Sequence, residues 1–318
     1  MRLVRWQQIL LILVTFYVGQ VFAAGKIDDL LEQADKVRSS DRVSFNRVMS
    51  ELATHKSPEM SSEQFNVLQL LEGYKAGIEG NYKSAETLLN QLINSDALLE
   101  VRFRAAFTLA NIQSLSRNFV PAFTNLNLAL SWIDKIEKPE LRVQVLISAA
   151  YTYSESGLFD ESQSYILQAR QNTLTDRDSC LLGLLYRQNM HSRNETYEGE
   201  QVSEIEQACT SANERLALAF MTALDALLLE SKQQHAAAYT LLQDGLAAAE
   251  QSKYPRLIAD YYLGLARTSY ALKEVTSATL YLDKIHAMSQ SLGFSMPLVR
   301  SYELQTQIHE ESNDISRL

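Results

Sequence analysis

The sequence is poor in residues that interrupt helices, with only 5 prolines and 11 glycines among 318 positions. Alanine, leucine, serine, glutamine and glutamate dominate instead, a mixture that favours helix over strand. Most of the prolines fall where a helix would begin, a position at which a fixed φ and a missing amide donor cost little. These are Pro58, Pro139, Pro255 and Pro297. The composition therefore predicts an all-α protein.

A long hydrophobic run is missing after Gly25. The most apolar stretch beyond it, residues 217–230, is interrupted by Asp225, and it falls short of the roughly 20 apolar residues that a spanning helix needs. We expect no stable membrane span in the chain that remains once its leader is removed.

The leader itself is residues 1–23. Arg2 and Arg5 precede a short apolar run, and residues 21–23 follow with a small-x-small cleavage pattern. These features predict a secretory signal peptide and therefore an exported protein. An uncleaved membrane anchor is the alternative, although the apolar run is shorter than a bilayer requires.

Basic residues are outnumbered, with 29 lysines and arginines against 38 acidic residues and a formal charge of -9. The leader holds two arginines and no acid, so its removal makes the charge about -11. A surface of this sign repels phosphate backbones, so we expect no nucleic-acid partner.

Recognisable catalytic chemistry is also missing. The five histidines never stand three or four positions apart, which excludes a helical metal pair. "GFSMP" begins like a nucleophile elbow, but Pro297 stands where glycine is required and no strand precedes it. We expect no catalytic residue, no metal site and no cofactor. An α-helical hydrolase or transferase would need a pocket of convergent ionisable groups, which the sequence does not reveal.

What the chain does contain is a repeated pattern of large and small residues around a turn. With Gly157 as the turn, the pattern is that of a tetratricopeptide repeat, in which small residues let two helices approach closely. A glycine at the turn permits a left-handed backbone at low cost. The pattern positions are Leu146, Ala149, Ala150 and Tyr153 before the turn, and Phe159, Ser162, Ile166 and Ala169 after it.

Copies of this pattern recur about every 37 to 40 residues. One uses Gly80 as its turn, whereas Arg117 and Lys273 replace the glycine in two others. Residues 178–213 occupy one repeat length but match the pattern poorly. Each helix pair leaves an apolar face that only its neighbour covers, so we predict a right-handed α-solenoid of antiparallel helix hairpins.

The ends of the array depart from the pattern. Residues 26–57 are helical without a turn glycine, which predicts a pair of N-terminal capping helices. The solenoid then spans residues 58–311, opening with a Ser61–Gln64 capping box, and residues 312–318 are a polar tail.

The two cysteines, Cys180 and Cys209, fall in the poorly matching unit. Antiparallel pairing of their helices brings them together, which predicts a disulfide in an exported protein. Two buried thiols are the alternative. A metal site would require more ligands than this pair supplies.

Ligand recognition is expected on the concave wall, which the first helix of each hairpin lines. Tyrosine and arginine are enriched at binding surfaces. The pattern positions that point away from the helix packing include Tyr74, Arg104, Asn111, Tyr151, Arg267 and Tyr270. Each one taken singly is also compatible with an ordinary solvated helix face.

Three segments resemble the periplasmic tetratricopeptide sensor region of bacterial membrane-bound diguanylate cyclases of the GGDEF type. They are "LLEQADKVRSSDRVSFNRVMSEL", "LLEGYKAGIEGNYKSAETLLNQLI", and the two-cysteine unit from "DSCLLGLLYRQ" to "QACTSANE". The resemblance spans roughly residues 26–311. It implies a periplasmic sensor half. No Gly-Gly pair occurs in the chain, so the catalytic signature of that family is missing and none of its active-site residues carries over.

The sequence thus predicts a non-enzymatic periplasmic binding module, serving as the sensory or protein-interaction part of a cyclic di-GMP signalling protein. Its partner would be a protein, a peptide or a small ligand, and a homodimer is left open. The chain would be either a piece of a longer cyclase or a stand-alone relic. The rival prediction is a cell-envelope scaffold that assembles proteins without signalling.

Overall fold

The computed structural model describes residues 25–55, 60–193, 195, 200–289 and 296–311. Within these ranges the chain forms helices and no strand, which confirms the predicted all-α solenoid. The predicted signal peptide, the polar tail and the boundary near residue 57 lie outside the described residues.

The helices follow one another as hairpins joined by short turns. The first helical segment covers 25–37. The α-helices after it are α2 (Arg42–Thr54), α3 (Ser62–Ile78), α4 (Tyr82–Ile93), α5 (Leu99–Leu115), α6 (Phe119–Leu130), α7 (Pro139–Glu155), α8 (Phe159–Arg170), α9 (Asp176–Ser192), α10 (Glu200–Ser211), α11 (Arg215–Ser231), α12 (His235–Gln251), α13 (Pro255–Ala271), α14 (Val275–Ala287) and α16 (Met296–Glu311). A short 3₁₀ turn, η1 (Ile133–Lys135), precedes α7.

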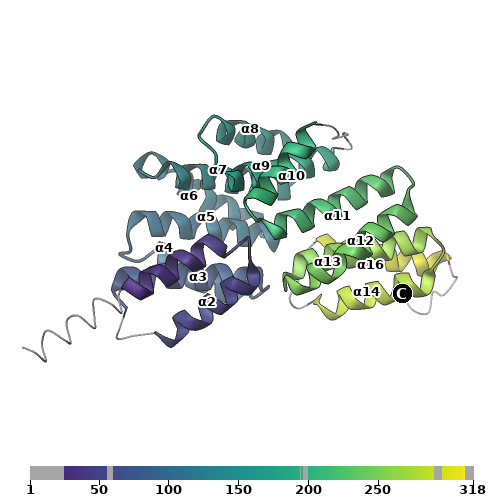
Figure 1. Cartoon of the computed structure of the whole chain (residues 1–318), viewed down its shortest axis with the longest axis horizontal. Helices are drawn as coiled ribbons and strands as arrows, with labels where there is room; N and C mark the ends of the chain where they lie inside the picture. The colour runs from purple at the N-terminus through teal and green to yellow at the C-terminus, as the bar shows by residue number, and fades with distance from the viewer. Residues whose placement is uncertain (1–24, 56–59, 194, 196–199, 290–295, 312–318) are drawn as a thin grey trace, which may run out of the picture.

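The hairpins stack in series. Each odd-numbered helix from α3 to α13 packs against the even-numbered helix that follows it, and those from α3 to α11 also pack against the odd-numbered helix of the next hairpin. This is the arrangement in Figure 1, where the array bends between the α2–α10 part and the α11–α16 part. Because every unit buries its apolar face against a neighbour, the chain has a series of linked cores rather than a single centre.

In five of the hairpins the turn after the first helix has the same geometry. Gly80, Arg117, Gly157, Gln233 and Lys273 stand two residues after their helices end, and all have φ between 57° and 85°. In each turn the amide of the following residue donates to a carbonyl five residues back, at 2.8–2.9 Å. These are Schellman caps, for which glycine is preferred. Arg117 and Lys273 thus occupy the predicted glycine slot in a left-handed conformation.

Small residues mark where helices approach closely, as the repeat predicts. A Cβ added to Gly73 on α3 would lie 2.7 Å from the side chain of Leu89 on α4. Leu89 is itself fully buried. A larger residue at position 73 would therefore push the two helices apart.

The poorly matching unit, α9 and α10, is held by polar groups. Asn189 accepts a hydrogen bond from Ser154 Oγ at 2.7 Å and donates one to Ser162 Oγ at 2.8 Å, all three being buried. Arg187 is buried and forms an ion pair with Asp225 on α11. Polar partners thus replace the apolar contacts that the repeat pattern predicts.

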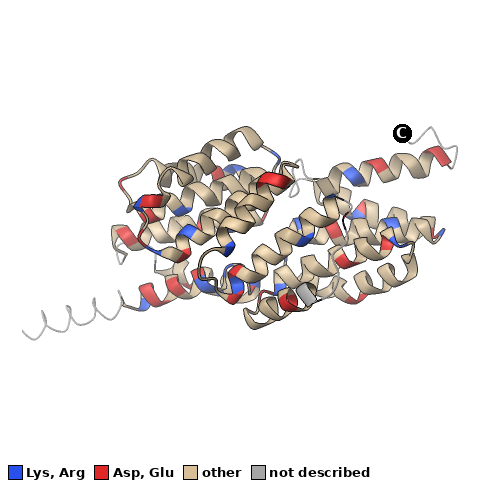
Figure 2. Ribbon diagram, turned by 90° about the horizontal axis from the view of Figure 1, so that it is seen from above, with Lys and Arg blue, Asp and Glu red and all other residues tan. Residues whose placement is uncertain are grey.

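The ends of the stack are covered by other helices. The hairpin of 25–37 and α2 has its own buried apolar cluster, which packs against α3. At the far end α16 packs against α13 and α14. Acidic and basic residues are distributed along both parts of the array (Figure 2). None of the helices in the described ranges combines the length and apolar character needed to cross a bilayer.

Candidate functional site

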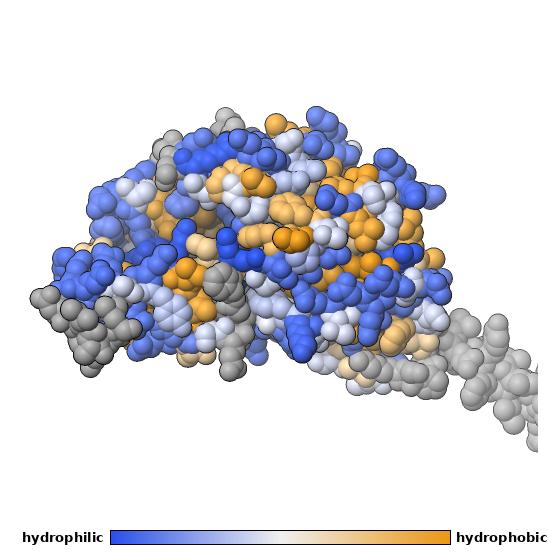
Figure 3. All heavy atoms as spheres, turned by 180° about the vertical axis from the view of Figure 1, so that it is seen from behind, coloured by the Kyte–Doolittle hydropathy of each residue, from blue (hydrophilic) through white to orange (hydrophobic). Residues whose placement is uncertain are grey.

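A cavity of about 760 Å³ lies on the side of the array formed by the first helices of successive hairpins. Its walls come mainly from α3, α5, α7, α9, α11 and α13, with the first turn of α16 at one end. The volume lies within the range of small-molecule sites. Seen from behind, the surface is hollowed, with hydrophobic residues in and beside the hollow (Figure 3).

Four of the six residues predicted for the concave wall line this cavity: Tyr74, Asn111, Tyr151 and Arg267. Asn111 accepts a hydrogen bond from Ser148 Oγ at 2.6 Å, which fixes its side chain. Burial raises the pKa of Tyr74 and, more strongly, that of Tyr151. Both phenols are therefore neutral donors at any physiological pH.

The other two predicted residues lie outside the cavity lining. Arg104 points to the N-terminal hairpin, where Asp35 forms an ion pair with it. Tyr270 lies near the C-terminal helix, and burial together with the Glu311 carboxylate raises its pKa to about 12. The pattern places both residues on the expected helices, but neither side chain lines the cavity, and that of Arg104 is turned to its acidic partner instead.

A buried charge cluster, which the sequence does not predict, forms part of the wall. Arg256 lies 3.5 Å from Glu155 and 3.3 Å from Asp260. Burial opposes the charge of Arg256, but the two carboxylates outweigh it and raise its pKa. The sequence indicates only the Arg256–Asp260 pair, because these opposite charges stand four residues apart on one predicted helix. Glu155 is 101 positions from Arg256, so no local pattern joins them.

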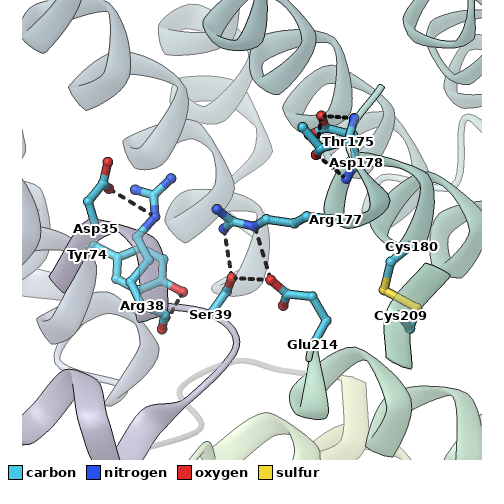
Figure 4. A network of polar contacts seen from close by, with 10 residues as sticks. All are labelled: Asp35, Arg38, Ser39, Tyr74, Thr175, Arg177, Asp178, Cys180, Cys209 and Glu214. Atoms are coloured by element: carbon cyan, nitrogen blue, oxygen red, sulfur yellow. Dashed lines mark hydrogen bonds and ion pairs between the residues drawn. A yellow bond between two sulfur atoms is a disulfide. The ribbon is translucent and has the colours of Figure 1, made fainter. Parts of the chain in front are cut away.

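A second polar cluster closes the wall beside the N-terminal hairpin (Figure 4). Ser39, in the turn before α2, accepts a hydrogen bond from Arg177 Nη2 at 2.7 Å and donates one to Glu214 Oε1 at 3.2 Å. Arg177 Nε lies 3.1 Å from the same Glu214 oxygen. We call these three residues the N-terminal clasp. All three line the cavity.

The clasp stands beside the disulfide. Cys180 and Cys209 are bonded, as predicted, with their Cα atoms 4.6 Å apart. Arg177 is three residues before Cys180 on α9, and the Glu214 amide donates to the Cys209 carbonyl at 2.9 Å. The bond thus ties together the two backbone segments that carry the clasp, as Figure 4 shows.

Between its charged ends the cavity wall is apolar. On α11 the residues facing it recur at helical spacing, and the facing turns of α9 add leucines. The residues are Leu181, Leu184 and Leu185 of α9, with Phe220, Leu224 and Leu227 of α11. This surface can bind an apolar group.

Metal ligation is not apparent in this surface. No group of three or more histidine, cysteine or acidic residues within the described ranges could hold a metal ion. The groups lining the cavity are paired arginines and carboxylates, neutral phenols and apolar side chains, a set suited to binding.

Comparison with known proteins shows the fold. No family model matches the sequence, and no curated protein matches it either. Among solved structures, a Rap protein crystallised in complex with competence and sporulation factor superimposes with a TM-score of 0.63 at 12% identity. The match covers 91% of this chain and 87% of that one. At this identity the likeness establishes a shared architecture: the chain has the helical-repeat fold of the tetratricopeptide type.

Proposed function

We propose that this chain is a non-enzymatic helical-repeat binding module that takes its ligand in the cavity between the first helices of its hairpins. The observation that carries the proposal is the cavity itself, about 760 Å³, with phenols, paired charges and an apolar wall. A protein of like fold has been crystallised with a bound factor, which supports the same use of the architecture here.

The module is exported to the bacterial periplasm and forms the sensory part of a cyclic di-GMP signalling protein. Export is supported by the leader pattern of residues 1–23 and by the Cys180–Cys209 disulfide, a bond that persists in oxidising compartments. The signalling role rests on the resemblance of the three quoted segments to cyclase sensor regions. A ligand that favours one curvature of the array would transmit a change, since equal affinity for both would shift nothing.

A cavity-filling variant tests the proposal. Ala223 of α11 lines the cavity, whereas Ala237 of α12 is exposed outside it. The chain would be produced in the periplasm with Ala223→Trp, with Ala237→Trp, or unchanged, and native mass spectrometry would record the bound molecules. We expect the bound species to be lost from Ala223→Trp alone. Equal occupancy in all three would contradict a cavity ligand.

Export and the scaffold alternative have their own readouts. A fusion of the N-terminal segment to a reporter that is active only outside the cytoplasm checks export, with Arg2 and Arg5 replaced as the control. If envelope proteins bind equally to the unchanged chain and to Ala223→Trp, while nothing occupies the cavity, the scaffold prediction replaces the sensor.

A further inference from the structure

The buried guanidinium of Arg38 is short of hydrogen-bond acceptors. Arg38 lies in the turn before α2, lines the cavity and is only 8% exposed. Its Nε is buried without a hydrogen-bond partner, and its ion pair with Asp35 is long, at 3.4 Å. Its other two nitrogens also make no hydrogen bond to the described residues. Buried donors without an acceptor raise the free energy of the folded state, so a group that supplies one binds there favourably.

Neighbouring side chains hold this guanidinium in place. The Tyr74 ring lies against it, with Arg38 Cζ 5.2 Å from the ring centroid. The Tyr74 hydroxyl donates to the Arg38 backbone carbonyl at 3.4 Å, which ties the same turn to α3. In Figure 4 the Arg38 guanidinium stands between the Asp35 carboxylate and the Arg177 guanidinium. An arginine fixed in this way presents its remaining donors at little cost in side-chain entropy.

A second arginine, Arg177 of α9, adds a donor to the same end of the cavity. Its Nη2 donates to Ser39 and its Nε pairs with Glu214, while Nη1 makes no hydrogen bond or ion pair to the described residues. The other acid of the cavity wall here, Asp178, is turned away. The amide and hydroxyl of Thr175 donate to its carboxylate at 3.0 and 2.7 Å, as Figure 4 shows.

Positive charge is in excess around these donors. Three arginines surround two carboxylates, Asp35 and Glu214. Burial opposes the charge of Asp35, but Arg38, Arg104 and Arg177 outweigh it and hold the pKa of Asp35 below its ordinary value. At Glu214 burial prevails and raises the pKa, which weakens the negative charge that this side chain contributes. The cluster thus carries a net positive charge that a single anion neutralises.

The balance of charge is reversed farther along α9. Gln188 Nε2 donates to Glu155 at 3.2 Å, and Glu155 and Asp260 share the single cation Arg256. Gln188 follows Arg177 by 11 residues, about 16 Å along the helix. An anion in the cavity is therefore repelled toward Glu155 and attracted toward the N-terminal clasp.

Apolar side chains begin one turn away from the clasp. Leu181 follows Arg177 by four residues on α9, about 6 Å along the helix, and Phe220 follows Glu214 by six residues. Both Leu181 and Phe220 are half-buried and line the cavity. A ligand with a charged group at the clasp therefore places the rest of its body against apolar surface, which gains free energy when it is covered.

We propose that the clasp end of the cavity is an oxyanion site, where Arg38 and Arg177 hold a carboxylate or phosphate group of a small ligand whose apolar body lies against Leu181 and Phe220. The assignment rests on the proposed cavity function and adds the ligand's chemical class and orientation. Arginine suits this role because its N–H donors match the oxygens of carboxylate and phosphate groups and form charge-assisted hydrogen bonds with them.

Matched probes separate the charged group from the body. Phenylacetate, benzylphosphonate, benzyl alcohol and benzylammonium carry the same benzyl group with a carboxylate, a phosphonate, a neutral or a cationic head. Their affinities would be measured by titration calorimetry at constant ionic strength. The titrations would use the unchanged chain and three variants whose helix content is checked by circular dichroism.

The variants separate Arg38 from the other cations of the cavity. Arg38→Gln removes the charge. Arg38→Lys keeps the charge beside Asp35 but loses the planar set of donors, and it serves as the test if Arg38→Gln does not fold. Arg300→Gln is the matched control, because Arg300 is another arginine of the cavity wall and lies near His191, 14 residues beyond Arg177 on α9.

We expect at least one of the two anions to bind about 10-fold more tightly than benzyl alcohol. The tighter of the two identifies the group as a carboxylate or a phosphate. Arg38→Gln should remove this preference and leave the affinity for benzyl alcohol unchanged, and Arg38→Lys should weaken the anion by about 3-fold or more. Arg300→Gln should keep the preference.

Four outcomes would overturn the oxyanion site. They are equal affinity for the anions and benzyl alcohol, an unchanged preference in both Arg38 variants, a preference lost equally in Arg300→Gln, and no binding of any probe. Binding that is independent of the head group and is abolished by Ala223→Trp would overturn the oxyanion site yet uphold the proposed cavity function, so the two failures are distinguishable.

Discussion

Ser39 and Glu214 share a hydrogen bond of 3.2 Å although 175 positions separate them in the sequence. Arg177 contacts both, so the N-terminal hairpin is fastened directly to the middle of the array rather than only through the intervening hairpins. The contact forms one side of the cavity wall, so the stability of that side depends on these three residues.

Removing the arginine of the clasp should be more damaging than removing the whole ion pair. Glu214 is only 2% exposed, and Arg177→Ala would leave its carboxylate buried without the arginine that pairs with it. We expect a loss of about 2–3 kcal/mol in the free energy of unfolding by urea, reduced because Arg177 itself is 27% exposed.

The double variant Arg177→Ala/Glu214→Ala is the control for this effect. It should cost less than Arg177→Ala alone, and therefore less than the sum of the single changes, because no unpaired charge remains. Strict additivity in the double-mutant cycle would show that the Arg177 and Glu214 side chains do not stabilise one another.

Loss of the disulfide should lower the stability of the α9–α10 unit, next to the clasp. The bond closes a loop between positions 29 apart, so replacing Cys180 and Cys209 by alanine should lower the free energy of unfolding by about 3–4 kcal/mol. Adding a reductant to the unchanged chain in denaturant should reproduce the effect and leave the double variant unaltered. A reductant effect of equal size on both proteins would show that the lost stability does not come from this disulfide.

Local geometry could be predicted from the sequence because it depends on residues a few positions apart. The left-handed slot of Gly157 recurs at Arg117 and Lys273, and the structure places positive φ at all three. The Ser61–Gln64 capping box forms as expected, with both of its hydrogen bonds. Repetition adds the stacking, since each hairpin needs a neighbour to cover its apolar face.

The site could be predicted only in part. Tyr74 and Tyr151 line the cavity, as their positions on the first helices of their hairpins predict. Arg104 instead turns to Asp35, 69 positions away in the sequence. The clasp and the Glu155–Arg256 pair join hairpins that are not consecutive, so their geometry depends on the accumulated curvature of the array. No short-range pattern encodes that curvature.

Backbone strain in the turns predicts one substitution that lowers the free energy of unfolding and one that raises it. Gly157 has φ 85° and a Cβ there would meet no atom within 4 Å, so Gly157→Ala tests conformation alone. We expect it to cost about 1 kcal/mol. Lys273, at φ 68°, should give the reverse, with Lys273→Gly stabilising by about 0.5–1 kcal/mol.

Lys273→Ala separates strain from side-chain contacts, since it removes the long side chain but keeps the Cβ. It should leave the free energy of unfolding near that of the unchanged chain. A gain as large as that of Lys273→Gly would trace the effect to the lysine side chain, which lies over the Tyr270 ring, rather than to φ.

Acid should loosen the N-terminal hairpin through Asp35. Burial alone would raise the pKa of Asp35, but Arg38 and Arg104 outweigh it and hold the pKa below its ordinary value of 3.8. The folded state therefore binds fewer protons than the unfolded chain, and the stabilisation is present above pH 3.8 and lost as the pH falls through the lowered pKa. Asp35→Asn should cost about 2 kcal/mol at neutral pH, and its difference from the unchanged chain should shrink below pH 4 in urea titrations. Asp96→Asn, at an exposed position, is the matched control and should show no such convergence. A constant difference between Asp35→Asn and the unchanged chain down to pH 2 would mean that its charge does not hold the hairpin in place.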